Sequence, residues 1–174
     1  MSWPGPRVLA HRGGGSLAPE NTLGAIRLGA SLGFKGVEFD VMLAGDGTPV
    51  VIHDETLERT TNGRGAVADT PYAVLAKLNA GNGEPLPTFQ QAARLCRELG
   101  LWANVEIKPA KGHERETGDE VAKMTSELWR DAEVPPLLSS FSREALSRAR
   151  EAAPALPRGL LVEKIPPEEL TDFG

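Results

Sequence analysis

The stretch GVEFDVML, residues 36–43, alternates apolar and acidic side chains and fixes how this part of the chain can fold. Successive side chains of a β-strand point to opposite faces, so Glu38 and Asp40 share one face and the apolar residues share the other. The apolar face predicts packing against a core. The acidic face has two interpretations at this point: the solvated side of an edge strand, or part of a functional site.

The stretch VEIK, residues 105–108, repeats the alternation with Glu106 and Lys108 on one face. Similar short apolar runs recur along the chain and are expected to be strands. The six expected strands cover residues 7–10, 36–43, 49–53, 101–108, 135–141 and 158–163.

Helical segments lie between most of these runs, and each has a residue that can cap its start. The expected capping residues are Thr22, Thr88, Thr117 and Ser142. Gly33 and Gly100 are expected to end the first two helices, and residues 166–170 look like a further helix start. Strands that alternate with helices predict an α/β fold with a mostly parallel sheet.

Two segments interrupt the alternation. Residues 44–48 have the composition of a tight turn between two strands, and residues 54–86 are rich in Gly, Asn and Thr. We interpret residues 54–86 as a small insertion that contains one short helix, begun by Thr70 and Pro71.

The composition is that of a soluble globular protein. The 174 residues include 19 Lys and Arg against 24 Asp and Glu, a formal charge of −5, with 40% hydrophobic and 25% charged residues. We expect residues 1–174 to form a single domain. A mildly acidic chain is not expected to bind nucleic acid or an anionic membrane, because both need a cationic surface.

The single cysteine, Cys96, cannot form an intramolecular disulfide and lies in an apolar helical stretch, where a buried thiol is expected. The N-terminal residues lack an apolar signal region, and no run approaches the roughly 18 apolar residues of a membrane span. These features predict a cytoplasmic protein without a membrane anchor.

Residues able to do chemistry fall at or near the carboxyl ends of expected strands, where active sites of parallel α/β proteins assemble. His11, Asp40, His53 and Glu106 are the clearest cases. His11 and His53 are two of the three histidines of the chain, and His113 lies in a polar run expected to be a solvated loop.

Three carboxylates, Glu38, Asp40 and Glu106, would form an all-oxygen site suited to Mg²⁺ or Ca²⁺, whereas zinc prefers more nitrogen or sulfur. Together with one divalent ion they leave a local charge of −1, so an anionic substrate would need nearby cations. Arg12 and Lys108 can supply them, although surface ion pairs are the alternative interpretation.

Imidazole titrates near the operating pH, so His11 and His53 suit general acid and base roles beside a metal and a phosphate. Asp54 could orient the neighbouring His53 or simply shape the turn, and both interpretations stay open here.

The sequence resembles the glycerophosphodiester phosphodiesterase family. The resemblance is carried by pieces in the family's order and spacing between residues 7 and 109. They are His11-Arg12-Gly13, Pro19-Glu20-Asn21-Thr22, Glu38-Phe39-Asp40, Val50-Val51-Ile52-His53-Asp54, Leu57-Glu58-Arg59-Thr60-Thr61-Asn62-Gly63 and Glu106-Ile107-Lys108.

The resemblance implies a TIM (β/α)₈ barrel with a small insertion after the third strand. It also implies metal-dependent hydrolysis of glycerophosphodiesters, such as glycerophosphocholine and glycerophosphoethanolamine, to glycerol 3-phosphate and an alcohol. By position, His11 and His53 match the acid/base pair and Arg12 and Lys108 match the phosphate-binding cations. The metal ligands match Glu38, Asp40 and Glu106.

The chain departs from the family in length, because a (β/α)₈ barrel typically needs about 250 residues. We expect an incomplete barrel of about six strands, whose open edges at residues 8–10 and 160–162 invite self-association. Two alternatives to the leading hypothesis follow: lysophospholipase D-type activity at the same site, and a non-catalytic fragment that needs a partner to complete the barrel.

Overall fold

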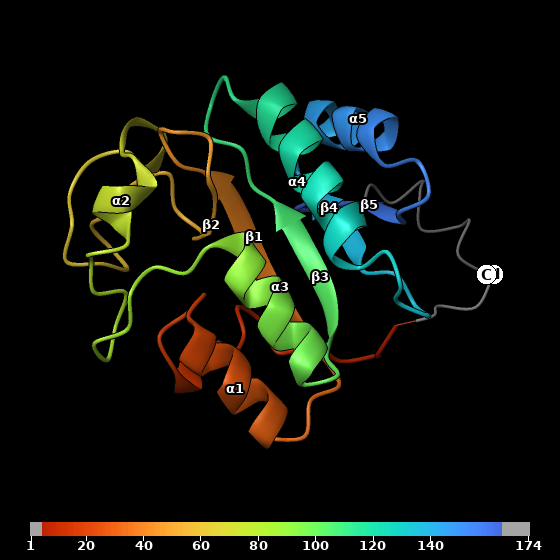
Figure 1. The fold of residues 1–174 in the computed structure, drawn as a ribbon, viewed down its shortest axis with the longest axis horizontal. Helices are drawn as coiled ribbons and strands as arrows, with labels where there is room; N and C mark the ends of the chain where they lie inside the picture. The colour runs from red at the N-terminus through yellow and green to blue at the C-terminus, as the bar shows by residue number, and fades with distance from the viewer. Residues whose placement is uncertain (1–4, 165–174) are drawn as a thin grey trace.

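The structure, a computed structural model, describes residues 5–164, which form a five-stranded sheet with helices packed against it (Figure 1). The strands are β1 (Gly36–Leu43), β2 (Pro49–Val51), β3 (Trp102–Ile107), β4 (Leu137–Ser140) and β5 (Arg158–Leu160). They are ordered β2-β1-β3-β4-β5, and every neighbouring pair is parallel except β1 with β2. The predicted α/β class is confirmed, and within residues 5–164 the sheet is not closed into a barrel.

Within residues 5–164, one α-helix precedes the first strand and three further helices of ten residues or more connect later strands; most begin where the sequence predicts. They are α1 (Leu23–Ser31), α3 (Phe89–Glu98), α4 (Glu114–Leu128) and α5 (Arg143–Ala152). The side chains that cap α1, α3 and α5 by accepting a backbone N–H are Thr22, Thr88 and Ser142. The predicted start at Thr117 is wrong. α4 begins earlier, and the Thr117 hydroxyl donates to the His113 carbonyl at 2.7 Å, a bond made inside a helix turn.

The expected strand over residues 7–10 is reduced to a single bridge between Ala10 and Val37. The Ala10 amide donates to the Gly36 carbonyl at 3.0 Å, and the Ala10 carbonyl accepts from Glu38 at 3.0 Å. In this parallel register residues 7–9 lie opposite residues 34–36, and because β1 begins only at Gly36 they have little strand to pair with. The expected strands over residues 49–53 and 158–163 end early, at residues 51 and 160, and the expected helix start at residues 166–170 lies outside the described residues.

The two faces of β1 have different neighbours, as the alternation predicts. Val37, Phe39 and Val41 are fully buried in the main core, which they share with apolar residues of the four longer helices. Figure 1 shows α3 and α4 in front of β1 and β3. The Phe39 and Phe89 rings, with centroids 6.0 Å apart, join β1 to α3. The face that carries the acidic residues is therefore the one turned away from the helices.

Residues 54–86 lie beside β2 and form an irregular segment that contains the short helix α2 (Tyr72–Leu75) and the 3-10 turn η2 (Val67–Asp69) (Figure 1). The tight turn at residues 44–48 is confirmed, since it joins the antiparallel strands β1 and β2. A second core cluster forms beneath this segment; it includes Met42, Val50, Ile52, Leu57, Val67, Leu75 and Leu86. The boundaries of an insertion within a single domain stay a prediction.

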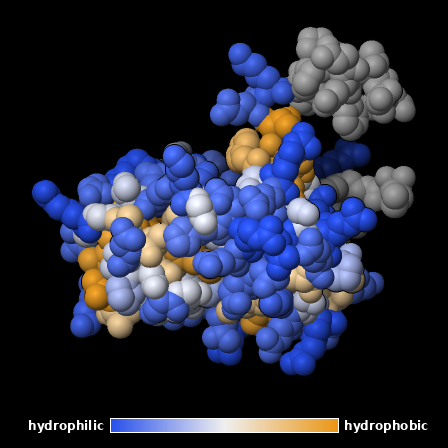
Figure 2. Space-filling view, turned by 90° about the horizontal axis from the view of Figure 1, so that it is seen from above, coloured by the Kyte–Doolittle hydropathy of each residue, from blue (hydrophilic) through white to orange (hydrophobic). Residues whose placement is uncertain are grey.

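Hydrophilic residues cover most of the face shown in Figure 2, and apolar residues appear there in smaller groups. Val8 and Val162, at the two predicted open edges, are exposed, whereas Ala10 is buried. Self-association through these edges stays a prediction. None of the helices in residues 5–164 has the length and apolar character needed to cross a membrane.

Candidate active site

The three predicted metal-ligating carboxylates lie together beside the carboxyl end of β3, with Glu38 and Asp40 in the first half and the middle of β1. The parallel register places Asp40 beside Glu106, and Glu38 precedes Asp40 by two residues on the same face. One oxygen from each carboxylate lies within 4.8 Å of the other two. The Asp40 residue is 1% exposed and Glu38 9% exposed, so negative charge is concentrated in a protected place.

The loop after Ala10 holds His11 and Arg12 over Glu38. The Arg12 amide donates to Glu38 Oε2 at 3.0 Å, and His11 Nε2 lies 3.8 Å from the same oxygen. Arg12 has a φ of +50°, in the left-handed region that costs a non-glycine residue energy. Gly13 follows with a φ of +89°, and a Cβ there would lie 2.9 Å from the Ile26 amide nitrogen of α1. This close backbone contact fixes the distance between the loop and α1.

Asn21 holds the Asp40 carboxylate in place by two hydrogen bonds. Its side-chain amide donates to Asp40 Oδ2 at 2.9 Å, and its side-chain carbonyl accepts from the Asp40 amide at 3.3 Å. Asn21 also has a positive φ of +60°, a conformation that Asn tolerates better than most residues. Because the residue is itself buried, it restricts Asp40 to one orientation.

The electrostatics of the carboxylates fit a divalent cation. Burial, together with the charges of Asp40 and Glu106, raises the pKa of Glu38 to about 8. Burial and Asp40 also raise the pKa of Glu106. Glu38 Oε1 is buried with no hydrogen-bond partner among the described residues, an arrangement that is costly unless a ligand binds the oxygen. A hard cation bound by oxygen ligands would relieve both the repulsion and the missing contact.

His53, two residues beyond the end of β2, has both ring nitrogens engaged. Its Nδ1 lies 2.6 Å from Asp54 Oδ1, and its Nε2 lies 2.7 Å from Lys108 Nζ. The Lys108 ammonium also lies 3.5 Å from a Glu106 oxygen and 3.9 Å from an Asp40 oxygen. Lys108 thus connects the histidine to the carboxylates, and the interpretation of Asp54 as the partner of His53 is the one that the geometry supports.

A second layer of charged residues surrounds this group. Arg12 Nη1 donates to Glu20 Oε1 at 2.8 Å, and Arg59 binds both Glu20 and Asp54. The hydrogen bonds from Arg59 are the largest cause of the lowered pKa values of Glu20 and Asp54. The two carboxylates therefore stay ionised well below neutral pH.

The structure brings all the predicted site residues to one end of the sheet, although their side chains are not equally enclosed. The His53 side chain is 27% exposed, whereas the His11 side chain is 68% exposed. Sequence reasoning missed Glu20, Asn21 and Arg59 as members of the site. Their only signal was their presence in the quoted family-like pieces, which assigned them no role.

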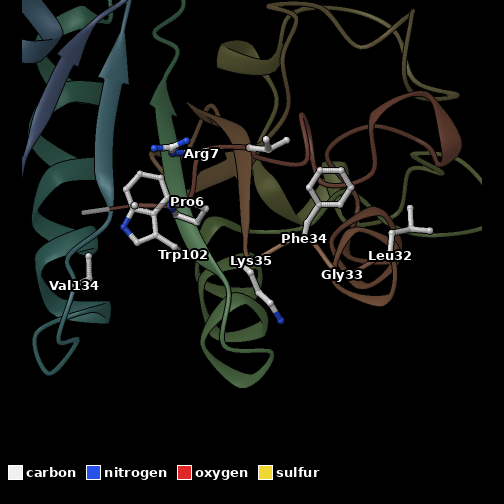
Figure 3. Close-up of a pocket in the computed structure, with 10 residues that line it drawn as sticks. Pro6, Arg7, Leu32, Gly33, Phe34, Lys35, Trp102 and Val134 are labelled. Carbon is white, nitrogen blue, oxygen red and sulfur yellow. The ribbon is translucent and has the colours of Figure 1, made fainter. Parts of the chain in front are cut away.

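Two hollows differ in their relation to these residues. One, of about 490 Å³, opens beside Glu106 and Lys108 and is also lined by Ser140 and Phe141 after β4. The other, of about 710 Å³, lies at the opposite ends of β1 and β3, where Figure 3 shows Pro6, Arg7, Leu32, Gly33, Phe34, Lys35, Trp102 and Val134. This second hollow is mostly apolar and none of its lining residues is a histidine or an acid. The first is the one placed to receive a molecule that reaches the carboxylates.

Known proteins are similar over nearly the whole chain. The model of the glycerophosphoryl diester phosphodiesterase family matches residues 11–172. A glycerophosphodiester phosphodiesterase of Caldanaerobacter subterraneus subsp. tengcongensis is 37% identical over 163 residues, which cover 90% of this chain and 66% of the relative. Human glycerophosphodiester phosphodiesterase 1 is 39% identical over 130 residues, 70% of this chain and 38% of the relative. The chain thus spans less than two thirds of the length of these curated relatives.

Solved structures show the same fold. An Oleispira antarctica phosphodiesterase, in complex with the product sn-glycerol-3-phosphate, is 39% identical with a TM-score of 0.86, covering 95% of this chain and 70% of that chain. A glycerophosphodiester phosphodiesterase of Agrobacterium tumefaciens is 31% identical with a TM-score of 0.72, covering 85% of this chain and 63% of that chain. The five-stranded open sheet therefore matches part of a TIM-barrel phosphodiesterase fold.

Proposed function

Because the chain belongs to the glycerophosphoryl diester phosphodiesterase family, we propose that it hydrolyses glycerophosphodiesters at the carboxylates that meet beside the carboxyl end of β3. The observation that carries this proposal is the convergence of three carboxylates, two cations and an anchored histidine at one end of the sheet. The product bound in the Oleispira phosphodiesterase supports sn-glycerol 3-phosphate as the product here as well.

Glu38, Asp40 and Glu106 would hold a divalent cation, and the all-oxygen donor set favours Mg²⁺ or Ca²⁺. Such a cation supplies positive charge that stabilises the oxygens of a phosphoryl group. Asn21 contributes by keeping the Asp40 carboxylate in one orientation.

Arg12 and Lys108 bind the anionic phosphoryl oxygens in this proposal. Arg12 Nε is buried 3.7 Å from an Asp40 oxygen and has no hydrogen-bond partner among the described residues, so it remains able to donate. Lys108 lies on the other side of Asp40 and borders the 490 Å³ hollow. Charge-assisted hydrogen bonds of this kind are about twice as strong as neutral ones.

The two histidines exchange protons with the reacting oxygens. During hydrolysis a new P–O bond forms as the attacking oxygen loses a proton, and the P–O bond to the alcohol breaks as the leaving oxygen gains one. His11, beside Glu38, and His53, beside Lys108, flank the carboxylates and can serve these two transfers.

The test is release of glycerol 3-phosphate from glycerophosphocholine and glycerophosphoethanolamine by His11→Ala, His53→Ala and His113→Ala proteins. His113 lies outside the site at the start of α4 and is the matched control. We expect losses of about 10²–10⁴-fold for His11→Ala and His53→Ala and none for His113→Ala. Folded, metal-loaded His11→Ala and His53→Ala proteins that are as fast as the parent would refute these roles.

A further inference from the structure

Arg59 is the centre of an ion-pair network that the proposed chemistry does not use. Its Nε and Nη2 donate to the two Asp54 oxygens at 2.5 and 2.8 Å. Its Nη1 and Nη2 donate to the two Glu20 oxygens at 2.9 and 2.8 Å. One guanidinium therefore forms paired hydrogen bonds with two carboxylates, and one of these is 39 residues away in the sequence.

One end of this network reaches His53. The Lys108 ammonium can only donate, so His53 Nε2 at 2.7 Å must accept. The ring proton of neutral His53 then lies on Nδ1 and is donated to Asp54 at 2.6 Å. Lys108 and Asp54 both favour this tautomer, and Arg59 holds Asp54 in the position from which it accepts the Nδ1 proton.

The other end reaches the predicted phosphate-binding arginine. Glu20 Oε1 accepts from Arg59 and from Arg12, so this carboxylate bridges the two guanidinium groups. The Arg12 side chain is 20% exposed and its Nε is buried. The hydrogen bond from Arg12 to Glu20 therefore fixes the position of the Arg12 guanidinium.

The arrangement is more specific than an ordinary surface ion pair. The two arginines and the two carboxylates sum to zero charge, and loss of Arg59 would leave one negative charge in excess. Exposed ion pairs usually contribute little to stability unless their geometry is bidentate or they form a network. Arg59 meets both conditions, because it makes paired hydrogen bonds to Asp54 and to Glu20. A lysine would keep the charge but could not form the paired bonds, because its ammonium lacks the planar fork.

We propose that Arg59 is a positioning residue that, through Asp54 and Glu20, stabilises the Nδ1-protonated tautomer of His53 and the placement of Arg12. This inference rests on the proposed function for its kinetic consequence. Its structural content, the tautomer of His53, does not depend on any hydrolysis.

The first test is ¹⁵N NMR of the histidine side chains at about pH 8, where unperturbed imidazoles are mostly neutral. His53→Gln identifies the His53 signals. The parent should show His53 protonated at Nδ1 and bare at Nε2. Arg59→Gln should show a larger share of the Nε2-protonated tautomer, and Arg59→Lys should show an intermediate share. Arg64→Gln, a change at an exposed arginine of the same segment, should match the parent. An unchanged His53 pattern in a folded Arg59→Gln protein would overturn the inference.

The second test compares kcat and KM in the same variants. We expect Arg59→Gln to lower kcat by about 10–100-fold, as removal of a supporting hydrogen bond does, and to raise KM through Arg12. Arg59→Lys should lose less of both kcat and substrate affinity than Arg59→Gln. The control variant Arg64→Gln should have the same kcat and KM as the parent. A loss that only follows the folded fraction, measured by circular dichroism, would show a merely structural role and refute the proposal. A parent without hydrolysis would count against the proposed function, while the NMR comparison still decides the role of Arg59.

Discussion

Asn21 and Asp40 are joined by two hydrogen bonds that close a ring between a loop and a strand. The Asn21 side chain donates to Asp40 Oδ2 at 2.9 Å and accepts from the Asp40 backbone at 3.3 Å. Asp40 has an oxygen within 4.8 Å of one from each of the other two carboxylates of the site, and it is almost fully buried. The loop that follows Arg12 therefore determines the orientation of a residue in the middle of β1.

Removal of the Asn21 amide should weaken metal binding. Asn21→Gly deletes the side chain while tolerating the φ of +60°, and Asn82→Gly makes the same change at a φ of +52° on an exposed loop. We expect Asn21→Gly to lower the affinity for Mg²⁺ or Ca²⁺ about 10–100-fold by titration calorimetry. Equal affinities in the parent and Asn21→Gly would show that Asp40 needs no such support.

The raised pKa of Glu38 should make the metal-free protein less stable than a variant without this carboxylate. On folding, Glu38 must either stay charged beside Asp40 and Glu106 or take up a proton, and both cost free energy above its ordinary pKa. Glu38→Gln should raise Tm in EDTA, by about 2–4 °C for each kcal/mol of relieved repulsion. The parent should gain about 2.7 kcal/mol at a metal concentration near 100 times Kd, and Glu38→Gln should lose most of this gain. Glu98→Gln, at an exposed position of α3, is the control and should respond to metal as the parent does. A full metal response in Glu38→Gln would exclude Glu38 as a ligand.

The close contact of the His11 loop with α1 should make Gly13 intolerant of a side chain. Gly13 and Gly112 have nearly the same φ, +89° and +88°, but only Gly13 has backbone atoms at the position of a Cβ. Gly112→Ala should cost about 1–2 kcal/mol from backbone strain alone. Gly13→Ala should cost about 1–3 kcal/mol more in urea denaturation, because the chain must shift. Equal losses would mean that the loop moves freely away from α1.

The thiol of Cys96 should be unreactive in the native protein. The residue is fully buried in the main core, and burial raises its pKa to about 12. We expect no labelling by a maleimide near neutral pH until denaturant is added, after which the thiol reacts fully. Rapid labelling of the folded chain would place Cys96 outside the core.

Much of the fold could be predicted because its signals are local. The alternation in residues 36–43 distinguishes the two faces of β1, and Thr22, Thr88 and Ser142 start their helices by a hydrogen bond that spans three residues. The start of α4 was predicted wrongly because Thr117 has the same composition signal but uses its hydroxyl to bond back to His113. A capping residue and a residue bonded back inside a helix look alike in sequence.

Some residues of the site could likewise be predicted from local sequence signals, and others could not. The carboxylates and His53 could be placed near strand ends from the sequence, whereas Arg59 and Glu20 could not be recognised as partners. They meet only because the loop after Ala10 and the segment after His53 fold toward each other, a tertiary relationship that spans 39 residues. The shortened pairing at Ala10 likewise depends on where β1 begins, at Gly36, which no property of residues 7–10 reveals.

Metal-dependent hydrolysis at this site is tested by release of glycerol 3-phosphate from glycerophosphocholine by the 174-residue chain, first in EDTA and then after addition of Mg²⁺ or Ca²⁺. We expect no release in EDTA, release once a divalent cation is restored, and none from Glu106→Gln under either condition. Hydrolysis that continues undiminished in EDTA, or in folded Glu106→Gln protein, would contradict a metal-dependent site built on Glu38, Asp40 and Glu106.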